Sequence, residues 1–287
     1  MSSSPLLSVV IPTWNRARLV CEAVESALAQ SPGGVEVIVV DDGSTDGTGE
    51  VLARRFGSRV RVLRQASRRG PGAARNAGVR EARGHLLAFL DSDDLWLPGK
   101  LDAELGVLER FPDAEVVVSD SLNFLEGRPD ERSRFEQNGL LAATGGEPRW
   151  MSECRWLWTN IQNNMATCSI TLRRAALAHF AGPLFAEDLT CCEDWEFEMR
   201  LHRYCRVVVL PRVLASVRRF DDGARPGRAV PGTPFTREQE IGLLRDRLTV
   251  MERAHWLDGL DAELAGELLR FRDETSRQLM NSERSED

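Results

Sequence analysis

Three carboxylates lie together in the middle of the chain. Asp91, Asp93 and Asp94 directly follow the apolar run His85–Leu90 (HLLAFL). Carboxylates this close repel one another, and a divalent cation removes that cost. Asp-x-Asp spacing offers two oxygen ligands to Mg²⁺ or Mn²⁺, which keep further positions for water and phosphate. Such an ion neutralises the charge on a departing diphosphate. The alternative is an acidic turn in which Asp93 or Asp94 caps a helix.

A second acidic segment, Val39–Asp46 (VVDDGSTD), also follows an apolar run. A carboxylate at the end of a strand, here Asp42, can accept hydrogen bonds from a nucleobase or a ribose. The alternative is an Asx-turn with helix capping by Ser44 or Asp46, and capping is the expectation for Asp46.

Gly70–Asn76 (GPGAARN) is similar to a glycine-rich phosphate loop, but Arg75 occupies the third glycine position of G-x-G-x-x-G. The dinucleotide fingerprint therefore fails. Its small residues allow close approach of a ligand, and we expect Arg75 or Asn76 to point toward a nucleotide.

Alternating strand and helix patterns position these segments. Strands are expected at Leu6–Pro12, Val35–Val40, Val60–Leu63, His85–Leu90 and Ala114–Ser119, and helices at Arg18–Gln30, Glu50–Phe56, Gly72–Ala82 and Lys100–Arg110. The alternation predicts an α/β fold with a parallel sheet and right-handed crossovers. Ligands bind beyond the carboxyl ends of such strands, so Trp14, Asp42 and Asp91–Asp94 should share one edge.

The second half is less regular. Asn123–Trp158 is expected to be an irregular, acceptor-side excursion, and Arg218–Pro234 a loop or hinge. Between them we expect strands at Cys168–Leu172 and Val207–Leu210 around a helix from Asp194 to Tyr204. Thr236–Met280 is helical, with Thr236 and Gln239 as a capping box, a stripe of Ile241, Leu244, Leu248 and Met251, and a break near Asp258–Leu260. These helices should pack on the domain or form a homodimer, and residues 281–287 should be disordered.

The amino-acid composition limits the functional classes that we expect for this protein. The 287 residues are 42% hydrophobic and 28% charged with net charge −7, as in a soluble globular protein, which gives no sign of a nucleic-acid partner. Six cysteines without a C-x-x-C pair predict neither a disulfide scaffold nor zinc, and Cys191 and Cys192 are expected to be structural thiols. No apolar run approaches a membrane span, so we expect a cytoplasmic protein, with the inner-membrane surface as an alternative site.

Four segments in order carry a resemblance to a known family: Ser8–Arg16 (SVVIPTWNR), Val39–Thr48, Gly70–Gly78 and Asp91–Asp94. Together they resemble the family 2 glycosyltransferases of the GT-A fold, closely over Leu7–Leu101 and loosely to about Phe220. The resemblance implies a mostly parallel central sheet flanked by helices, with a C-terminal helical extension. The expected division is a catalytic domain over 1–225 (donor half 1–120, acceptor half 121–225), a helical extension over 226–280 and a disordered tail over 281–287.

The resemblance also implies roles for residues. The nucleotide-binding set would be Pro12, Thr13, Trp14, Asp42, Arg75, Asp91, Ser92 and Arg219. Asp93, with Asp91, would bind Mn²⁺ or Mg²⁺, and the pair Glu193-Asp194 would supply the catalytic base, with Asp194 preferred. From the residues alone, first-turn capping of a helix remains the alternative for this pair.

One segment departs from the family. Phe220 stands where relatives commonly carry histidine, and a third metal ligand there is not expected. Arg218 or Arg219 would stabilise the leaving phosphates, or form a solvated basic turn. Trp150, Trp156, Trp158 and Trp195 are either sugar-stacking or core residues, with core packing favoured.

The predicted function is transfer of a sugar, with inversion, from a UDP- or dTDP-linked donor to an unidentified glycan, lipid-linked or natural-product acceptor. A single base with no second carboxylate as nucleophile favours inversion. One alternative is a silent nucleotide-sugar-binding subunit, which predicts missing carboxylates. The other is a nucleotidyltransferase, which would need a glycine-rich basic loop where Pro12–Asn15 stands.

Overall fold

The first four predicted strands form a parallel β-sheet in the computed structural model, which describes residues 5–30, 34–125, 128–153, 165–219, 237–253 and 262–284. β1 (Leu7–Thr13) pairs in parallel with β2 (Val35–Asp41) and β4 (Leu86–Phe89), and β2 pairs with β3 (Val60–Arg64). Every residue of β1 is buried. Strands covered on both faces are apolar throughout rather than alternating, which is why these runs were recognisable.

The rest of the sheet is mixed. In the described chain, ten strands share one sheet, with the order β3-β2-β1-β4-β9-β6-β10-β5 and with β7 and β8 attached to β6 and β10. β9 (Ile170–Arg173) runs antiparallel between β4 and β6 (Val116–Leu125). Parallel pairing returns between β6 and β10 (Val207–Arg219). The sheet is thus less parallel than expected, because β9 is not joined to its neighbours by a crossover helix.

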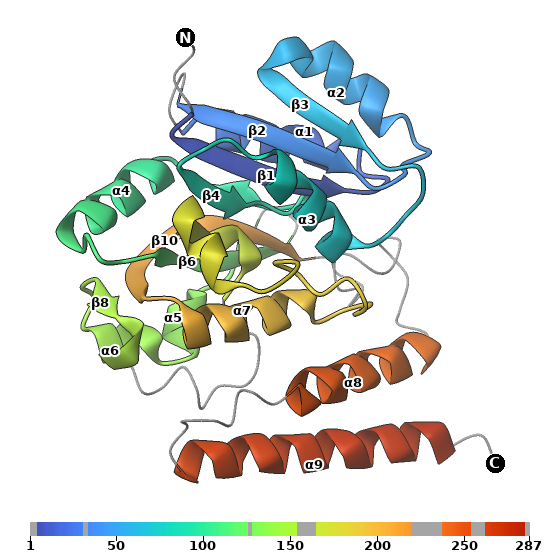
Figure 1. Ribbon diagram of the computed structural model, residues 1–287, viewed down its shortest axis with the longest axis vertical. Coiled ribbons are helices and arrows are strands. Elements are labelled where there is room, and N and C mark those ends of the chain that lie inside the picture. The colour runs from blue at the N-terminus through green and yellow to red at the C-terminus, as the bar shows by residue number, and fades with distance from the viewer. Residues whose placement is uncertain are drawn as a thin grey trace.

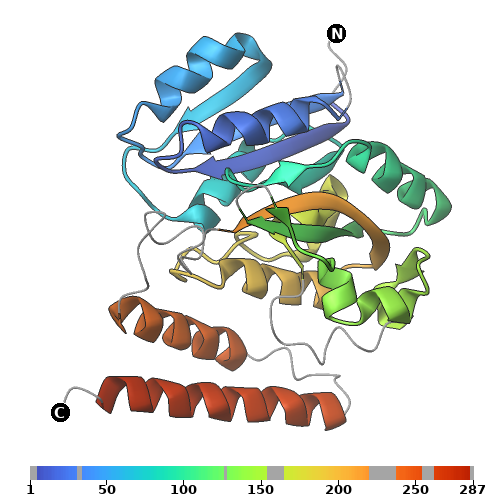
Figure 2. The same cartoon turned by 180° about the vertical axis from the view of Figure 1, so that it is seen from behind.

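Helices cover both faces of the sheet (Figures 1 and 2). On one face, α1 (Leu19–Leu28), α2 (Thr48–Phe56) and α4 (Lys100–Arg110) pack on side chains such as Val9 and Val39. On the other, α3 (Pro71–Glu81) and α7 (Glu193–Tyr204) pack on side chains such as Val10 and Phe89. Residues alternate between faces along each strand, so neighbours such as Val9 and Val10 enter different cores.

Several boundaries differ from the sequence-based prediction. β6 and β10 are longer than predicted, and β5 (Leu95–Trp96) was not predicted. The excursion predicted as irregular contains, among its described residues, β7 (Arg128–Pro129), α5 (Arg134–Gln137), α6 (Leu140–Thr144) and β8 (Arg149–Trp150). Such elements are too short to show a periodic pattern, and side chains fix them instead. Asp120 Oδ1, for example, accepts a hydrogen bond from the backbone N–H of Phe135 at 2.9 Å.

Two C-terminal helices, α8 (Arg237–Glu252) and α9 (Ala262–Arg284), lie side by side next to α7 (Figures 1 and 2). The predicted capping residue Thr236 and the predicted break at 258–260 lie outside the described residues. α9 continues through Arg284, so residues 281–284 are helical where a disordered tail was expected. None of the described helices combines the length and the apolar composition that a membrane span requires.

Candidate active site

The predicted strand-end residues do meet at one edge of the sheet. The N–H of Asp42 donates to the carbonyl of Thr13 at 2.9 Å, and the N–H of Leu90 donates to that of Val10 at 3.1 Å. The ends of β2 and β4 therefore flank the end of β1, as expected for ligand binding at the carboxyl edge of parallel strands. Pro12 and Thr13 are buried within β1, and Trp14 follows half-buried.

Asp42 orders the segment that leads into α3. Its Oδ1 accepts from the N–H of Arg69 at 2.7 Å, and its Oδ2 accepts from the N–H of Gly70 at 2.8 Å. Burial raises the pKa of Asp42, although these two backbone donors oppose the rise. The carboxylate thus shapes the turn before α3, and its contact with a nucleobase stays a prediction.

The neighbouring acidic residues have local roles. Asp41 Oδ1 accepts from the N–H of Ser44, three residues on, at 2.8 Å. Asp46 forms an Asx-turn, because its Oδ1 accepts from the N–H of Thr48, two residues on, at 3.1 Å. The N-cap of α2 is Gly47 and has no side-chain cap, so Asp46 lies one residue before the position it was expected to occupy.

Trp14 forms a flat platform with a residue that the sequence analysis did not single out. The guanidinium carbon of Arg68 lies 3.7 Å from the centroid of the Trp14 ring, a stacked cation–π geometry. Arg68 is exposed, whereas Trp14 is half-buried. An aromatic face and a cation at the end of β1 suit a planar, electron-rich base.

Arg75 connects the donor edge to the start of α7. Its Nη2 lies 2.6 Å from Asp91 Oδ1, and its Nη1 lies 2.9 Å from Glu193 Oε1. The side chain is only 4% exposed. Burial would lower its pKa, but the two carboxylates more than compensate and hold the pKa above its ordinary value. Arg75 therefore stays charged and contacts Glu193, which lies 118 positions away in the chain.

Close backbone approach makes this connection possible. A Cβ on Gly72 would lie 2.9 Å from the carbonyl oxygen of Ala186, and a Cβ on Gly78 would lie 2.3 Å from Val10 Cγ1. Both distances are shorter than nonbonded carbon contacts allow. The glycines of the GPGAARNAG segment thus let α3 approach both β1 and the segment before α7.

Asp93 is the candidate metal ligand that best fits a cation. Its Oδ1 lies 2.8 Å from Arg16 Nη1, while its Oδ2 is buried and has no hydrogen-bond partner. Burial and the nearby Asp91 raise the pKa of Asp93, and Arg16 opposes the rise. An orphaned carboxylate oxygen beside a second carboxylate fits Mg²⁺ or Mn²⁺.

The protein contributes few ligands to such an ion. Among the described residues, no three histidine, cysteine or acidic side chains converge on one metal position. Mg²⁺ and Mn²⁺ sites in nucleotide enzymes commonly use one or two carboxylates, with phosphate and water completing the shell. Asp93 and Asp91 are consistent with that arrangement.

Asp94 connects the Asp91–Asp94 turn to strand β10. The N–H of Arg218 donates to Asp94 Oδ1 at 2.9 Å, and burial, followed by the charges of Asp93 and Asp91, raises the pKa of Asp94 well above its ordinary value. Because α4 begins after Gly99, neither Asp93 nor Asp94 caps it. The capping alternative is therefore wrong here, although the N–H of Asp94 closes a turn onto the carbonyl of Asp91 at 3.0 Å.

The two arginines at the end of β10 face different partners. Arg218 Nε donates to the carbonyl of Asp93 at 2.9 Å, which places this side chain beside the D-x-D turn. Arg219 Nε donates to Asn123 Oδ1 at 3.2 Å on the neighbouring strand β6. Phe220 lies outside the described residues. Ser92 is buried, and its hydroxyl lies 3.5 Å from Arg16 Nη1.

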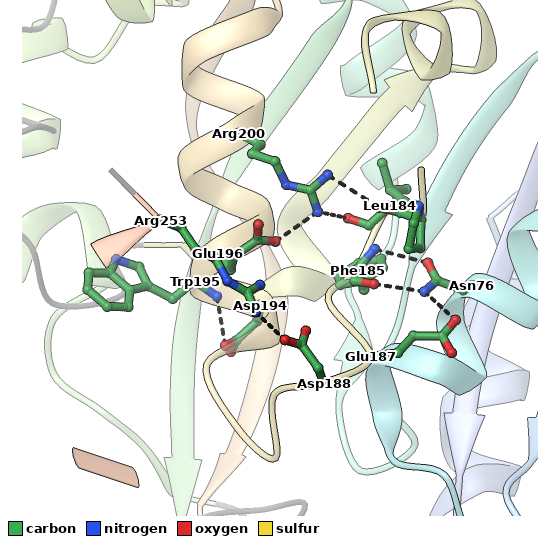
Figure 3. A network of polar contacts seen from close by, with 11 residues as sticks. Asn76, Leu184, Phe185, Glu187, Asp188, Asp194, Trp195, Glu196, Arg200 and Arg253 are labelled. Atoms are coloured by element: carbon green, nitrogen blue, oxygen red, sulfur yellow. Dashed lines mark hydrogen bonds and ion pairs between the residues drawn. The ribbon is translucent and has the colours of Figure 1, made fainter. Parts of the chain in front are cut away.

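Glu193 and Asp194 open α7 and differ in their surroundings. Burial and the charge of Asp194 raise the pKa of Glu193 to about 7, against the opposing effect of Arg75. Asp194 Oδ1 accepts from the N–H of Trp195 at 2.8 Å (Figure 3), a first-turn contact that is compatible with the capping alternative. Glu193 is engaged by Arg75, so it is the weaker candidate for a base.

Asn76, one residue after Arg75, holds the segment that precedes α7. Its Oδ1 accepts from the N–H of Phe185 at 2.9 Å, and its Nδ2 donates to the carbonyl of Phe185 at 2.8 Å (Figure 3). Nδ2 also lies 3.0 Å from Glu187 Oε1. The side chain thus bonds to this segment, and of the two residues proposed to face a nucleotide, Arg75 is the one beside the D-x-D turn.

Two of the four tryptophans singled out can be placed. Trp150 packs edge to face on Phe111, with ring centroids 5.5 Å apart. Trp195 is buried against Val250 and Met251 of α8. Both pack against apolar side chains, as favoured, whereas Trp156 and Trp158 lie outside the described residues.

The comparison with known structures identifies the fold as GT-A. The chain aligns with S. aureus TarS 1-349 in complex with UDP-GlcNAc at a TM-score of 0.62 and 20% identity, covering 98% of this chain and 73% of that one. It aligns with the mannosyltransferase PcManGT from Pyrobaculum calidifontis, in complex with GDP-Man and Mn2+, at 0.63 and 18%, covering 98% and 74%.

The sequence comparison identifies the family. The model of glycosyl transferase family 2 matches residues 8–180, so the chain belongs to this family of sugar-transferring enzymes. An uncharacterised glycosyltransferase of Rickettsia typhi is 35% identical over 144 residues, which are 47% of this chain and 44% of the relative. The succinoglycan biosynthesis protein ExoO of Rhizobium meliloti is 46% identical over 97 residues, 34% of this chain and 28% of the relative. The matched regions thus span less than half of these curated relatives.

Proposed function

We propose that this chain transfers a sugar from a nucleoside-diphosphate donor, UDP- or dTDP-linked, to a hydroxyl-bearing acceptor, with inversion at the anomeric carbon. The observation that carries the proposal is the position of Arg75, which binds Asp91 on the donor side and Glu193 beside Asp194. One buried cation thereby connects the predicted donor site with the predicted base. The UDP-GlcNAc and GDP-Man complexes of the structural neighbours support a nucleotide-sugar donor.

The donor would lie across the carboxyl edge of β1, β2 and β4. The Trp14–Arg68 stack would hold the base, Asp91 and Ser92 would face the ribose, and Arg219 would approach the phosphates. Asp93, with Asp91, would hold Mn²⁺ or Mg²⁺, which when bound neutralises charge on the leaving diphosphate. The buried, unpartnered Oδ2 of Asp93 and the Mn2+ in the PcManGT complex support this assignment.

Asp194 would accept the proton of the acceptor hydroxyl as its oxygen attacks the anomeric carbon from the face opposite the diphosphate. The bond from the anomeric carbon to the diphosphate oxygen breaks as the new glycosidic bond forms, so a single displacement inverts the configuration. Glu193 would position Arg75 rather than take the proton, because its carboxylate already pairs with that guanidinium.

The proposal extends to the acceptor class and to the location of the protein. The name of the relative ExoO favours a glycan acceptor, within the wider set of glycan, lipid-linked and natural-product acceptors. We retain the proposed layout of a catalytic domain over residues 1–225 with a helical extension after it. A cytoplasmic location, the inner-membrane surface and pairing of two copies through α8 and α9 remain proposals that a fractionation and a solution mass measurement would test.

A donor screen tests the proposal. The full-length protein is incubated with a panel of UDP-, dTDP- and GDP-sugars with Mn²⁺ or Mg²⁺, and released nucleotide and sugar are measured. We expect slow metal-dependent hydrolysis of one donor, which Asp93→Ala abolishes. Asp102→Ala is the matched control, because it removes one exposed carboxylate near the start of α4.

The two alternative functions predict different results in these assays. Tight donor binding without cleavage under any metal, even with acceptor extracts of the host, would identify a silent binding subunit. Formation of a nucleotide-sugar from a nucleoside triphosphate and a sugar phosphate would identify a nucleotidyltransferase. A chain that neither binds nor cleaves any donor would refute the proposed enzyme.

A further inference from the structure

We infer that the helix pair α8–α9 positions the catalytic base, with Asp246 of α8 as a positioning residue for Asp194. This inference rests on the proposed function, since it assigns a role to residues outside the donor and acceptor sites. We use base loop for residues 187–192, the segment that leads directly into Glu193 and Asp194.

Asp246 holds the end of the base loop through two hydrogen bonds. Its Oδ2 accepts from Thr190 Oγ1 at 2.7 Å and from the backbone N–H of Cys191 at 2.7 Å. Hydrogen bonds to a charged acceptor are short and about twice as strong as neutral ones. A second contact lies at the other end of the same loop, where Arg253, just after α8, forms an ion pair with Asp188 (Figure 3).

An apolar contact fixes α8 and α9 against the first turn of α7. Trp195 is buried with Val250 and Met251 of α8. The ring of Phe271, on α9, meets Trp195 edge to face with centroids 6.4 Å apart. Trp195 directly follows Asp194, so both sides of the candidate base touch the helix pair through their neighbours.

The backbone of the base loop needs this support. Cys192 has φ of 62°, in the left-handed region that residues other than glycine seldom occupy. The carbonyl of Cys192 then accepts from the N–H of Glu196 at 2.9 Å, the first hydrogen bond of α7. A strained residue at a helix start persists only where surrounding contacts determine its conformation. The two bonds from Asp246 act on the residues immediately before it.

The opposite side of the loop is held by the donor half. Glu187 Oε2 lies 2.6 Å from Arg69 Nη2, and Glu187 Oε1 lies 3.0 Å from Asn76 Nδ2. Arg69 is also the residue whose N–H binds Asp42. The base loop is therefore attached to the donor side through Glu187, and to α8 and the residue after it through residues 188, 190 and 191, so the position of Asp194 depends on both sets of contacts.

The experiment compares Asp246→Ala, Asp246→Asn and Arg245→Gln in the full-length protein. Arg245 is the matched control, because it is the adjacent residue on α8 and forms an exposed ion pair with Glu283 of α9. The measurements are kcat and KM for the donor, the Kd for UDP with Mn²⁺, and amide hydrogen exchange of the peptide that contains residues 187–192.

In Asp246→Ala we expect kcat to fall by roughly 10- to 100-fold, because small misplacement of a catalytic group has effects of this size. The donor KM and the UDP Kd should stay within about twofold, since only the base is displaced. Exchange at Cys191 should become faster. Asp246→Asn, which keeps a neutral acceptor oxygen, should be intermediate, and Arg245→Gln should match the wild type in all four measurements.

Thr190→Val provides a second route if Asp246→Ala does not fold. It removes one of the two donors to Asp246 and should lower kcat several-fold with unchanged UDP affinity. An active wild type whose kcat survives in both Asp246→Ala and Thr190→Val would overturn the positioning role while leaving the proposed function intact. A parallel loss of UDP affinity would also overturn it, because the role would then be in donor binding. A wild type that binds and cleaves no donor would remove the proposed function and this inference together.

Discussion

The donor edge and the base region of this protein are built in different ways. At the donor edge, the important residues follow strands that are neighbours in the sheet, and Asp42 is held by the backbone of a turn 27 residues away. In the base region, Glu193 and its loop contact side chains from α3 and α8, which lie far from them in the chain. The first region depends on regular parallel pairing, and the second depends on single side-chain contacts.

This difference predicts where substitutions act. Changes in the base region should affect turnover more than donor affinity, whereas changes at the donor edge should affect metal and nucleotide binding. Arg75 contacts both regions, so its replacement should lower both turnover and the binding of metal and nucleotide. The following predictions test this comparison.

The largest expected effect is on turnover. Asp194→Asn removes the proposed base and should lower transfer by about 1,000-fold, equivalent to about 4 kcal/mol. The affinity for UDP with Mn²⁺, measured by isothermal titration, should be close to that of the wild type. Asp102→Asn, a surface carboxylate variant, serves as the control. Loss of UDP binding in Asp194→Asn would instead make Asp194 a donor contact and would break the comparison.

Arg75→Met should impair both regions and the fold. It leaves the buried carboxylate of Glu193 and the nearby Asp91 without their cation, and removing one partner of a buried pair costs about 4 kcal/mol. Chemical denaturation would measure this as a lower midpoint at an unchanged slope. Arg80→Met, at the end of the same helix and exposed, is the control. Unchanged stability in Arg75→Met would contradict the bridging role.

Glu193→Gln should alter the pH dependence of stability. Burial raises the pKa of Glu193 from an ordinary 4.5 to about 7, so its neutral form is the one that folding favours. The stability contributed by protonated Glu193 is complete below pH 4.5 and is lost as the pH rises through about 7. The stability of the variant relative to the wild type should therefore rise with pH over this interval, in addition to a pH-independent cost of losing the charged bond to Arg75.

Thermal unfolding of both proteins at several pH values between 4 and 9 would measure this difference. Glu109→Gln, at an exposed position near the end of α4, is the control. Its free energy of unfolding should stay within about 0.5 kcal/mol of the wild type. A stability difference between Glu193→Gln and the wild type that does not vary with pH would exclude a buried, ionising Glu193.

The smallest expected effect concerns Arg16. Its guanidinium pairs with Oδ1 of Asp93, the proposed metal ligand, and so its positive charge opposes a divalent cation at the same carboxylate. Arg16→Gln should raise the affinity for Mn²⁺ in the presence of UDP by about tenfold, or 1.4 kcal/mol. Arg18→Gln removes the same charge from an exposed position two residues on and should have little effect. Weaker Mn²⁺ binding in Arg16→Gln would place Arg16 on the side of the donor.

The sequence predicts the donor half of the fold well. Strands such as Val35–Asp41 contain a continuous buried apolar run, here residues 37–40, and the intervening helices have a periodic pattern. The rule that ligands bind at the carboxyl edge of parallel strands then predicts from the sequence that Trp14, Asp42 and Asp91 lie at one edge. The small residues of the GPGAARNAG segment were expected to allow close approach of a ligand, whereas in the structure Gly72 and Gly78 allow close approach of other parts of the chain.

The remaining features depend on contacts that no local pattern encodes. β9 is a short buried run whose antiparallel direction follows from its partners rather than its residues. Arg16 and Arg68 are single arginines in polar segments, and only the fold places them on Asp93 and Trp14. The hydrogen bond that the N–H of Cys191 donates to Asp246 joins residues 55 positions apart. A polar run before a helix was visible at residues 187–192, but nothing in it identified α8 as its support.

The continuous sheet limits how this protein can move during turnover. Strand β9, from the proposed acceptor half, pairs with β4 on one side and with residues 116–118 of β6 on the other, and both of these segments belong to the proposed donor half. Opening the two halves like a hinged clamp would break these ladders and leave buried peptide groups unpaired. We therefore expect the donor to enter and the product to leave through displacement of loops and side chains, while the sheet stays rigid. Rates of nucleotide release should accordingly respond to substitutions in the connections, and scarcely at all to those within the strands.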